Sequence, residues 1–93
     1  MALTFEWNPV KAAANLRKHG IDFAEATTVF RDTLSSTILD PDHSKPGEDK
    51  ELTIGLSHRY RLFVVAYCKR GRNIRIITAR PATRQERKAY EEG

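Results

Sequence analysis

The residues best suited to chemistry are arginines that border two apolar segments in the second half of the chain. Arg61 precedes the apolar run Leu62–Cys68, and Arg80 follows the run Ile74–Ala79. If the two runs form a hairpin, antiparallel pairing places the start of one strand beside the end of the other. A guanidinium group binds phosphate oxygens through two parallel hydrogen bonds and keeps its charge. The spacing predicts that Arg61 and Arg80 converge on one phosphate group, and the alternative is that each is a solvated strand-end residue.

The distribution of charge favours a polyanionic partner such as RNA. Residues 1–56 contain six Lys or Arg and nine Asp or Glu, a net charge of −3, whereas residues 57–93 contain ten and three, a net charge of +7. Basic side chains that neutralise phosphates release counterions, so the resulting affinity falls with salt. The alternative is a solvated basic face without a ligand. The residues expected to attract the RNA backbone are Arg59, Lys69, Arg70, Arg72 and Arg75.

Length and composition limit the class of protein. A chain of 93 residues suits one small domain, residues 1–93. Its one cysteine, Cys68, has no intrachain partner and lies in an apolar run, which favours a small buried residue in a reducing compartment. No apolar run approaches the roughly 20 residues that span a bilayer, and no N-terminal stretch resembles a signal peptide. We expect a cytoplasmic protein without a metal or nucleotide cofactor, because zinc-ligand spacings and phosphate-loop glycines are absent from the sequence.

The periodicity of apolar residues predicts an α+β fold with the order β-α-α-β-β-β-β-α. Asn8 and Pro9 begin the first helix and Gly20 ends it, while Asp22 and Glu25 resemble the capping box of the second. Because both helices precede the run of strands, we expect them on one face of a mainly antiparallel sheet whose opposite face is open. The predicted strands cover residues 3–7, 34–39, 50–57, 62–68 and 74–79, and the predicted helices cover 9–19, 22–30 and 83–92.

Alternation within single strands predicts which side chains are buried. Trp7 belongs to the apolar set of the first strand and is expected in the core, with stacking on RNA as the alternative. In the strand 50–57, the leucines and Ile54 form the buried face, whereas the face with Thr53 and Ser57 is polar. His19 lies at the end of the first predicted helix, where a cationic ring favours the helix dipole.

Five segments of the chain together resemble the BrnT toxins of bacterial type II toxin–antitoxin systems. They are FEWNPVKAAANLRKHGIDFAEATTVF, DPDHS, IGLS, RLFVVAY and RIITARPATRQERKAYEE, in this order, and they cover nearly the whole chain. The resemblance implies a RelE-like fold and a metal-independent ribonuclease that inhibits translation. It also implies neutralisation by a cognate BrnA antitoxin, in a hetero-oligomer that binds operator DNA through the antitoxin. The sequence departs from the family pattern at Asn8, Lys50, Thr78 and Pro81.

A ribonuclease that uses no metal ion needs three kinds of group. It must activate the ribose 2′-OH, stabilise the added negative charge at phosphorus, and protonate the leaving 5′-oxygen. We expect Arg61 and Arg80 to stabilise the charge, with Lys50 as a further cation. His43 lies in the polar loop DPDHS and, with an ordinary pKa of about 6.5, could exchange a proton near neutrality. The alternative for His43 is a local hydrogen bond to a neighbouring aspartate.

The last predicted helix supplies two further candidates. Glu86 and Tyr90 are four residues apart and therefore share one helix face. Proteins with the fold that the resemblance implies often use their C-terminal segment for a base or for a tyrosine that stacks on the substrate. The alternative for Tyr90 is packing against the sheet. For the whole chain, the alternative function is a non-catalytic nucleic-acid-binding or protein-interaction domain with a basic face.

Overall fold

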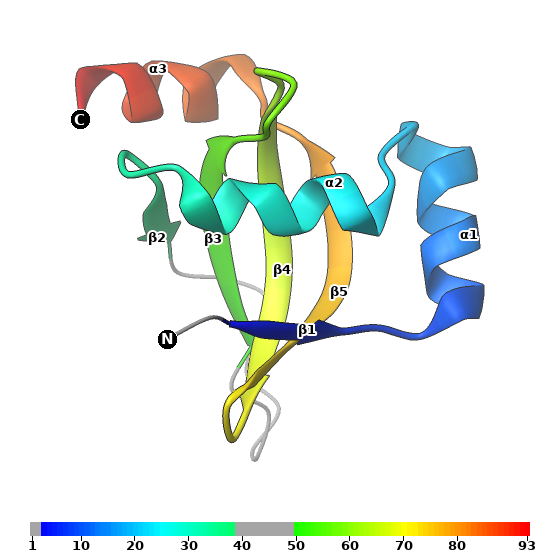
Figure 1. The fold of residues 1–93 in the computed structure, drawn as a ribbon. Helices are drawn as coiled ribbons and strands as arrows, with labels where there is room; N and C mark the ends of the chain where they lie inside the picture. The colour runs from blue at the N-terminus through cyan, green and yellow to red at the C-terminus, as the bar shows by residue number, and fades with distance from the viewer. Residues whose placement is uncertain (1–2, 39–49) are drawn as a thin grey trace.

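The fold is of the α+β class, as the sequence predicts (Figure 1). A computed structural model of the chain describes residues 3–38 and 50–93. A short 3-10 helix, η1 (Thr28–Arg31), continues directly from α2, so the second predicted helix is two shorter elements. The elements in chain order are β1 (Thr4–Glu6), α1 (Pro9–His19), α2 (Phe23–Thr27), η1, β2 (Ser36–Ile38), β3 (Lys50–Leu56), β4 (Leu62–Arg70), β5 (Asn73–Pro81) and α3 (Arg84–Glu92).

The five strands form one mixed sheet with the order β1-β5-β4-β3-β2. The strands β2, β3, β4 and β5 pair in antiparallel fashion. The edge strand β1 instead pairs in parallel with β5, with Phe5 opposite Ile74. An irregularity in β4–β5 pairing falls between Ala66 and Tyr67, where Ala66 is opposite Thr78 and Tyr67 is opposite Ile76. This bulge sets which β5 side chains share a face of the sheet.

The helix ends follow local signals in the sequence. The Asn8 side chain accepts hydrogen bonds from the backbone N–H groups of Val10 and Lys11, at 2.8 and 3.3 Å. Gly20 ends α1 in the left-handed conformation, with φ of 69°. Thr83 and Glu86 form a reciprocal capping box at the start of α3. The predicted caps of α1 and α3 are therefore confirmed.

One face of the sheet, here called the helix-covered face, packs against α1, α2 and η1. Its core includes Phe23 and Val29 from the helices and Phe63 and Val65 from β4. Trp7 packs against this core, with its ring centroid 6.0 Å from that of Phe23 in an edge-on contact. The predicted core placement of Trp7 is confirmed. In Figure 1, α2 crosses in front of the central strands and α1 stands at their side.

The other face, here called the opposite face, contains Val64 and Ile54 and is partly covered by α3. Tyr90 of α3 packs on these residues, so the face predicted to be open is covered at one end. Thr78 of β5, by contrast, is exposed. Packing of Tyr90 against the sheet was the alternative for this residue, whereas cover of the face by α3 was not expected, because the helix is mainly polar and lacks an apolar stripe along its length.

The polar side of β3 is buried, contrary to the prediction of a polar face. Thr53 and Ser57 are each 4% exposed. Gly55 lies so close to η1 that an added Cβ would be 2.9 Å from Cγ1 of Val29. The absence of a side chain at Gly55 allows η1 to approach the strand, and the small polar side chains around it are satisfied by hydrogen bonds.

Candidate functional site

The guanidinium group of Arg61 is bound to Glu25 of α2. Its Nε and terminal NH2 groups donate hydrogen bonds to the two Glu25 oxygens, at 3.0 and 2.5 Å. The Ser57 hydroxyl donates to the same carboxylate at 2.7 Å, and Glu25 is only 6% exposed. The hydrogen bonds from Arg61, followed by that from Ser57, lower the pKa of Glu25 to about 2 against the cost of burial. Glu25 is therefore ionised and fixes Arg61.

The sequence predicted a helix-capping role for Glu25, and the structure shows a different one. Its spacing from Asp22 suggested a capping box, and Asp22 does cap α2 by accepting a hydrogen bond from the Ala24 N–H at 2.8 Å. Glu25 instead projects to the loop after β3, where Arg61 and Ser57 bind it. The available signal was a carboxylate between the buried residues Phe23 and Ala26, a position where a charge needs a partner.

The Ser57–Arg61 loop, which connects β3 and β4, has a closed network of hydrogen bonds. The Ser57 N–H donates to the Arg61 carbonyl at 2.8 Å, and the Tyr60 N–H donates to the Ser57 carbonyl at 2.9 Å. The Ser57 Oγ accepts from the N–H groups of Arg59 and Arg61, at 3.2 and 3.3 Å. The His58 N–H donates to Oγ1 of Thr28 at 2.9 Å, which ties the loop to η1.

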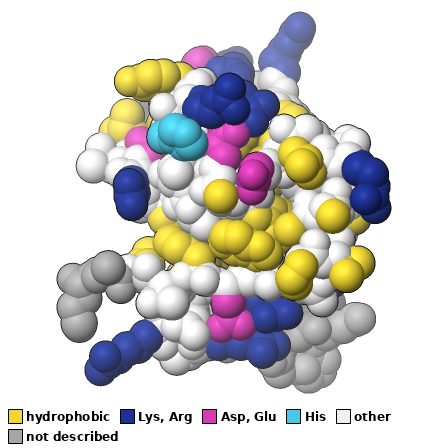
Figure 2. Space-filling view, turned by 45° about the vertical axis from the view of Figure 1, so that its right-hand side comes forward, with side chains coloured by type: hydrophobic (Ala, Val, Ile, Leu, Met, Phe, Trp, Pro, Cys, Tyr) yellow, Lys and Arg dark blue, Asp and Glu magenta, His cyan; other side chains and the backbone are white. Residues whose placement is uncertain are grey.

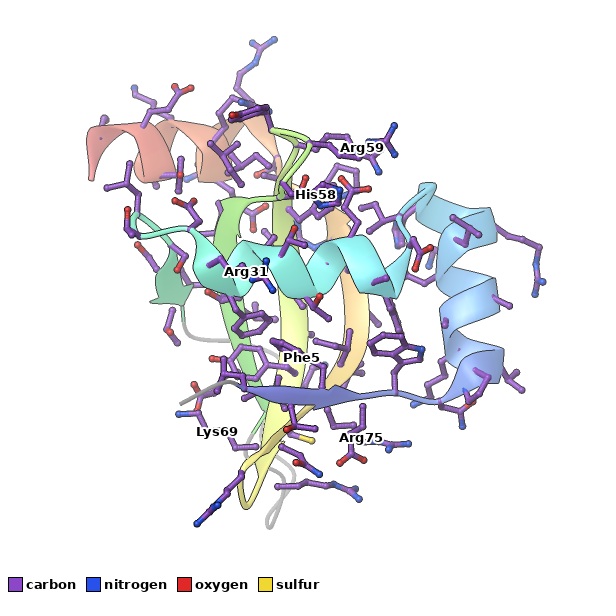
Figure 3. The ribbon with its side chains drawn as sticks, viewed as in Figure 1. Phe5, Arg31, His58, Arg59, Lys69 and Arg75 are labelled. Carbon is purple, nitrogen blue, oxygen red and sulfur yellow. The ribbon has the colours of Figure 1, made fainter. Side chains whose placement is uncertain are left out.

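A shallow pocket lies between this loop and η1. Figure 3 shows His58 and Arg59 at the loop, and Arg31 on the helical segment beside it. Near the same end of the molecule, Lys and Arg side chains gather around a histidine and acidic side chains in Figure 2. The pocket is lined by Thr28, Arg31, Asp32, Leu56, Ser57, His58 and Tyr60. Its rim therefore combines cationic, aromatic and hydrogen-bonding groups.

Arg80 is bound to Glu86 of α3 on the opposite face. Two parallel hydrogen bonds of 2.8 Å join its terminal nitrogens to the two carboxylate oxygens. Glu86 also accepts a hydrogen bond from the Thr83 N–H at 2.9 Å. The pKa of Glu86 is lowered to about 2, first by the hydrogen bonds from Arg80 and then, after the opposing effect of burial, by the Thr83 N–H. Arg80 remains 37% exposed, so its guanidinium group is oriented but still accessible.

Tyr90 joins α3 to the segment that follows η1. Its hydroxyl donates a hydrogen bond to Oδ2 of Asp32 at 2.5 Å, and the Leu56 N–H donates to the same oxygen at 2.8 Å. Burial, followed by the hydrogen bond to Asp32, raises the pKa of Tyr90 to about 12. Tyr90 is therefore a neutral donor that packs against the sheet, which was the alternative reading of this residue.

Arg61 and Arg80 lie on opposite faces of the sheet. Arg61 stacks over Phe63, 5.0 Å from the ring centroid, and binds α2 on the helix-covered face. Arg80 is opposite Val64, whose side chain belongs to the opposite face. The prediction that the two guanidinium groups converge on one phosphate is therefore wrong. Adjacent strand ends are close, but the alternation of side chains separates the two groups.

Lys50 and Arg75 lie on the same face as Arg80. Lys50 is opposite Cys68, and Cys68 is opposite Arg75, so Lys50, Cys68 and Arg75 form one row across β3, β4 and β5. Arg75 donates a hydrogen bond to Oε2 of Glu6 at 2.8 Å. Cys68 is partly exposed in this row and is not the buried core residue that the sequence suggested.

The residues predicted to attract RNA divide between two ends of the sheet. Figure 3 shows Lys69 and Arg75 at the end of the sheet away from His58 and Arg59. Arg70 and Arg72 are exposed near the β4–β5 turn, beside Lys69. Lys69 approaches Glu51 with a separation of 3.9 Å between charged atoms. The basic surface is therefore two separate groups, and Arg59 belongs to the Ser57–Arg61 loop.

His43 lies outside the described residues, so its predicted role stays a prediction. His19 is at the last position of α1, as expected, and His58 is exposed and contacts Thr28 through Nδ1 at 3.3 Å. Within residues 3–38 and 50–93, no three His, Cys, Asp or Glu side chains are grouped so that they could hold a metal ion. In the same ranges, no helix is sufficiently long and apolar to cross a membrane.

The fold and the basic residues on both faces define a small α+β protein with a mixed five-stranded sheet and exposed cationic side chains. Residues 7–86 match the sequence profile of the family described as ribonuclease toxin, BrnT, of type II toxin–antitoxin systems. The chain therefore belongs to the BrnT family. It is similar to the Brucella abortus ribonuclease toxin BrnT, whose crystal structure was determined at 1.1 Å, with a TM-score of 0.67 and 21% sequence identity. The match covers 89% of this chain and 100% of the Brucella chain. Comparison with curated proteins found no match.

Proposed function

We propose that this protein is a RelE-like endoribonuclease toxin that cleaves RNA without a metal ion and thereby inhibits translation. Membership of a ribonuclease toxin family supports the reaction class. The observation that carries the proposal is that Lys50 of β3 and Arg75 and Arg80 of β5 lie on one face of the sheet. Cations in this arrangement suit the phosphate backbone of a single strand that crosses the sheet.

Arg80 is the group best placed to stabilise negative charge at phosphorus. Its exposed guanidinium is held in one orientation by Glu86, so little conformational freedom is lost when phosphate binds. In the proposed reaction the ribose 2′-OH attacks phosphorus, the bond to the 5′-oxygen breaks, and a 2′,3′-cyclic phosphate and a 5′-hydroxyl form. Lys50 is proposed as a second cation that binds the backbone of the same RNA strand.

We propose that groups other than Glu86 and Tyr90 carry out the proton transfers. A carboxyl with a pKa of about 2 is a weak base, and a phenol with a pKa of about 12 is neutral near pH 7. We therefore propose positioning roles for both residues and keep His43 as the candidate base or acid. Arg61 is held by buried Glu25 on the helix-covered face, away from Lys50 and Arg80, so its proposed role is to fix the Ser57–Arg61 loop.

We further propose a cognate BrnA-type antitoxin as the protein partner, in a cytoplasmic hetero-oligomer that binds operator DNA through the antitoxin. Family membership supports an antitoxin partner. Such a partner neutralises the toxin if it covers the face of Lys50 and Arg80 or draws α3 away from it. The tie of α3 to the body through Tyr90 and Asp32 makes its position sensitive to a bound partner.

Induction of the chain in bacteria, with and without the antitoxin, tests the proposal. We expect growth arrest and new RNA ends that the antitoxin prevents, and cleavage by purified protein that persists in EDTA. Intact RNA together with normal growth, from folded protein, would contradict the nuclease assignment. Cleavage that stops in EDTA would contradict the metal-independent mechanism alone.

A non-catalytic RNA-binding function is the second candidate. It is favoured by the ion pairs of Arg61, Arg75 and Arg80, each of which is engaged by a carboxylate. Under this alternative the purified protein retains RNA in a salt-sensitive complex and leaves it uncut. Both functions predict binding, so the integrity of the recovered RNA distinguishes them.

A further inference from the structure

Tyr60 presents an aromatic ring to solvent from an unusual backbone conformation. It is 85% exposed, and its φ of 62° makes it the one non-glycine residue with positive φ in the described part of the chain. Side chains with a Cβ rarely adopt this conformation, which persists only where surrounding contacts impose it. An exposed ring held in this way gains nothing from burial, so its placement calls for another explanation.

The contacts that impose this conformation come from Ser57 and Glu25. The Ser57 Oγ accepts two backbone N–H groups of the loop while its hydroxyl donates to buried Glu25. The Ser57 carbonyl accepts the Tyr60 N–H. Arg61 also binds Glu25, so the residues Ser57 and Arg61, which flank Tyr60 in the loop, are both held by the same carboxylate. The ring is therefore displayed by a preorganised loop and does not depend on its own packing.

Two exposed arginines belong to the neighbourhood of Tyr60. Arg59, the residue before it, has a side chain that is 68% exposed. Arg31 is exposed on η1 and, with His58, lines the same pocket as Tyr60 (Figure 3). The two nearby carboxylates already have donors: Glu25 binds Arg61 and lies 3.9 Å from the Arg59 guanidinium, and Asp32 accepts hydrogen bonds from Tyr90 and Leu56. Arg31 therefore lies on the rim of the pocket and Arg59 beside Tyr60 in the loop, and both arginines are exposed.

We propose that the Ser57–Arg61 loop is a binding site for single-stranded RNA. One unpaired base stacks on the Tyr60 ring, and Arg59 and Arg31 bind the phosphates on either side of that nucleotide. An aromatic face between cations is the arrangement that recognises unpaired bases, because every base has a stacking surface and each nucleotide adds one phosphate. An acidic protein segment would use the arginines and would leave the ring without a partner.

This site deepens the proposed function, on which it rests for its class of substrate. Arg80 is opposite Val64, three residues after the loop ends, although it lies on the other face of the sheet. RNA bound at Tyr60 can continue round this end of the sheet to Arg80. The loop would then hold nucleotides beside the cleaved bond and contribute affinity and sequence preference, while the chemistry takes place elsewhere.

Fluorescence anisotropy with a labelled 2′-O-methyl RNA tests the site. Methylation removes the attacking hydroxyl, so binding is measured without cleavage. Tyr60→Leu removes the aromatic face, and Tyr60→Gly removes it while relieving the positive φ, so at least one variant keeps the fold. We expect both to weaken binding about tenfold, and Tyr60→Phe to remain within about twofold of the wild type. Arg59→Ala should weaken binding and reduce its salt dependence, whereas Lys11→Ala, an equal change of charge on α1, should do so less.

The outcomes separate this inference from the proposed function. Equal affinity of wild type, Tyr60→Leu and Tyr60→Gly for the methylated RNA would overturn the loop site, even if the wild type cleaves ordinary RNA. Loss of antitoxin binding with unchanged RNA binding in the same variants would also overturn it and identify a protein-docking loop. Tyr60-dependent binding by a wild type that never cleaves RNA would support the loop site and overturn the nuclease assignment.

Discussion

Glu25 and Arg61 are 36 residues apart in the sequence, yet they form the most buried ion pair among those in the described part of the chain. The carboxylate of α2 receives both Nε and NH2 of the guanidinium group, at 3.0 and 2.5 Å. Ser57 adds a third hydrogen bond to the same carboxylate. One side chain therefore determines how α2 sits on the sheet and how the Ser57–Arg61 loop is shaped.

Replacing Glu25 tests this dual role. We expect Glu25→Gln to lower the free energy of unfolding by about 2 kcal/mol, because Arg61 loses a charged partner and the amide cannot satisfy both Arg61 and Ser57. Urea denaturation measures the change. Glu91→Gln, at an exposed position on α3, is the matched control and should alter stability by less than about 0.5 kcal/mol. Equal midpoints for the two variants would show that the ion pair does not stabilise the fold.

The two low carboxyl pKa values predict a loss of stability in acid. Glu25 and Glu86 both have folded pKa values of about 2, below the ordinary value of 4.5. Because the folded state binds these protons less tightly than the unfolded state, the contribution is complete above about pH 4.5 and declines as the pH falls toward 2. Unfolding free energies measured between about pH 7 and pH 3 should fall in the wild type. The double variant Glu25→Gln, Glu86→Gln should show a flatter profile, and identical slopes would contradict the assignment.

Much of the fold is predictable from local signals, because caps and alternation are short-range properties. Asn8, Gly20 and Thr83 act as the sequence predicts. The parallel pairing of β1 with β5 was not predictable from local pattern, since it depends on how α1 and α2 return the chain across the sheet. The buried polar side of β3 was misjudged for a related reason. A small residue such as Gly55 lets a helix approach the strand closely and bury its polar side, and the hydropathy pattern does not show where this happens.

The candidate site was predictable by residue type and less so by geometry. The arginines that border the two apolar runs were identified. The face of the sheet on which each side chain lies depends on strand register, which places Arg61 and Arg80 on different faces. Their carboxylate partners were missed: Glu25 lies far away in the sequence, and Glu86 was expected to act on the substrate. The positive φ of Tyr60 has no sequence signal, because left-handed tyrosine is imposed by the surrounding hydrogen bonds.

The contact between Tyr90 and Asp32 predicts that one hydroxyl stabilises the position of α3. Tyr90→Phe keeps the ring and removes the donor, so we expect a loss of about 1 to 2 kcal/mol and faster amide exchange in α3 than in β4. Hydrogen exchange followed by mass spectrometry measures both regions. The matched control is Tyr60→Phe, because the Tyr60 side chain is almost fully exposed. Unchanged exchange in α3 would mean that apolar packing alone holds the helix.

Arg80 and Glu86 provide the sharpest test of the proposed cleavage chemistry. If Arg80 stabilises the charge that develops at phosphorus, Arg80→Ala should lower kcat by about 100-fold while the fold is retained. Glu86→Gln keeps the shape of the side chain and weakens only the orientation of the guanidinium, so we expect a smaller loss of less than about tenfold. A catalytic base at Glu86 would instead make the two losses similar and shift the acidic limb of the pH–rate profile in the wild type. Single-turnover cleavage of a short RNA in EDTA, measured across pH for both variants, therefore separates a positioning carboxylate from a reacting one. Full activity of Arg80→Ala would remove this arginine from the mechanism.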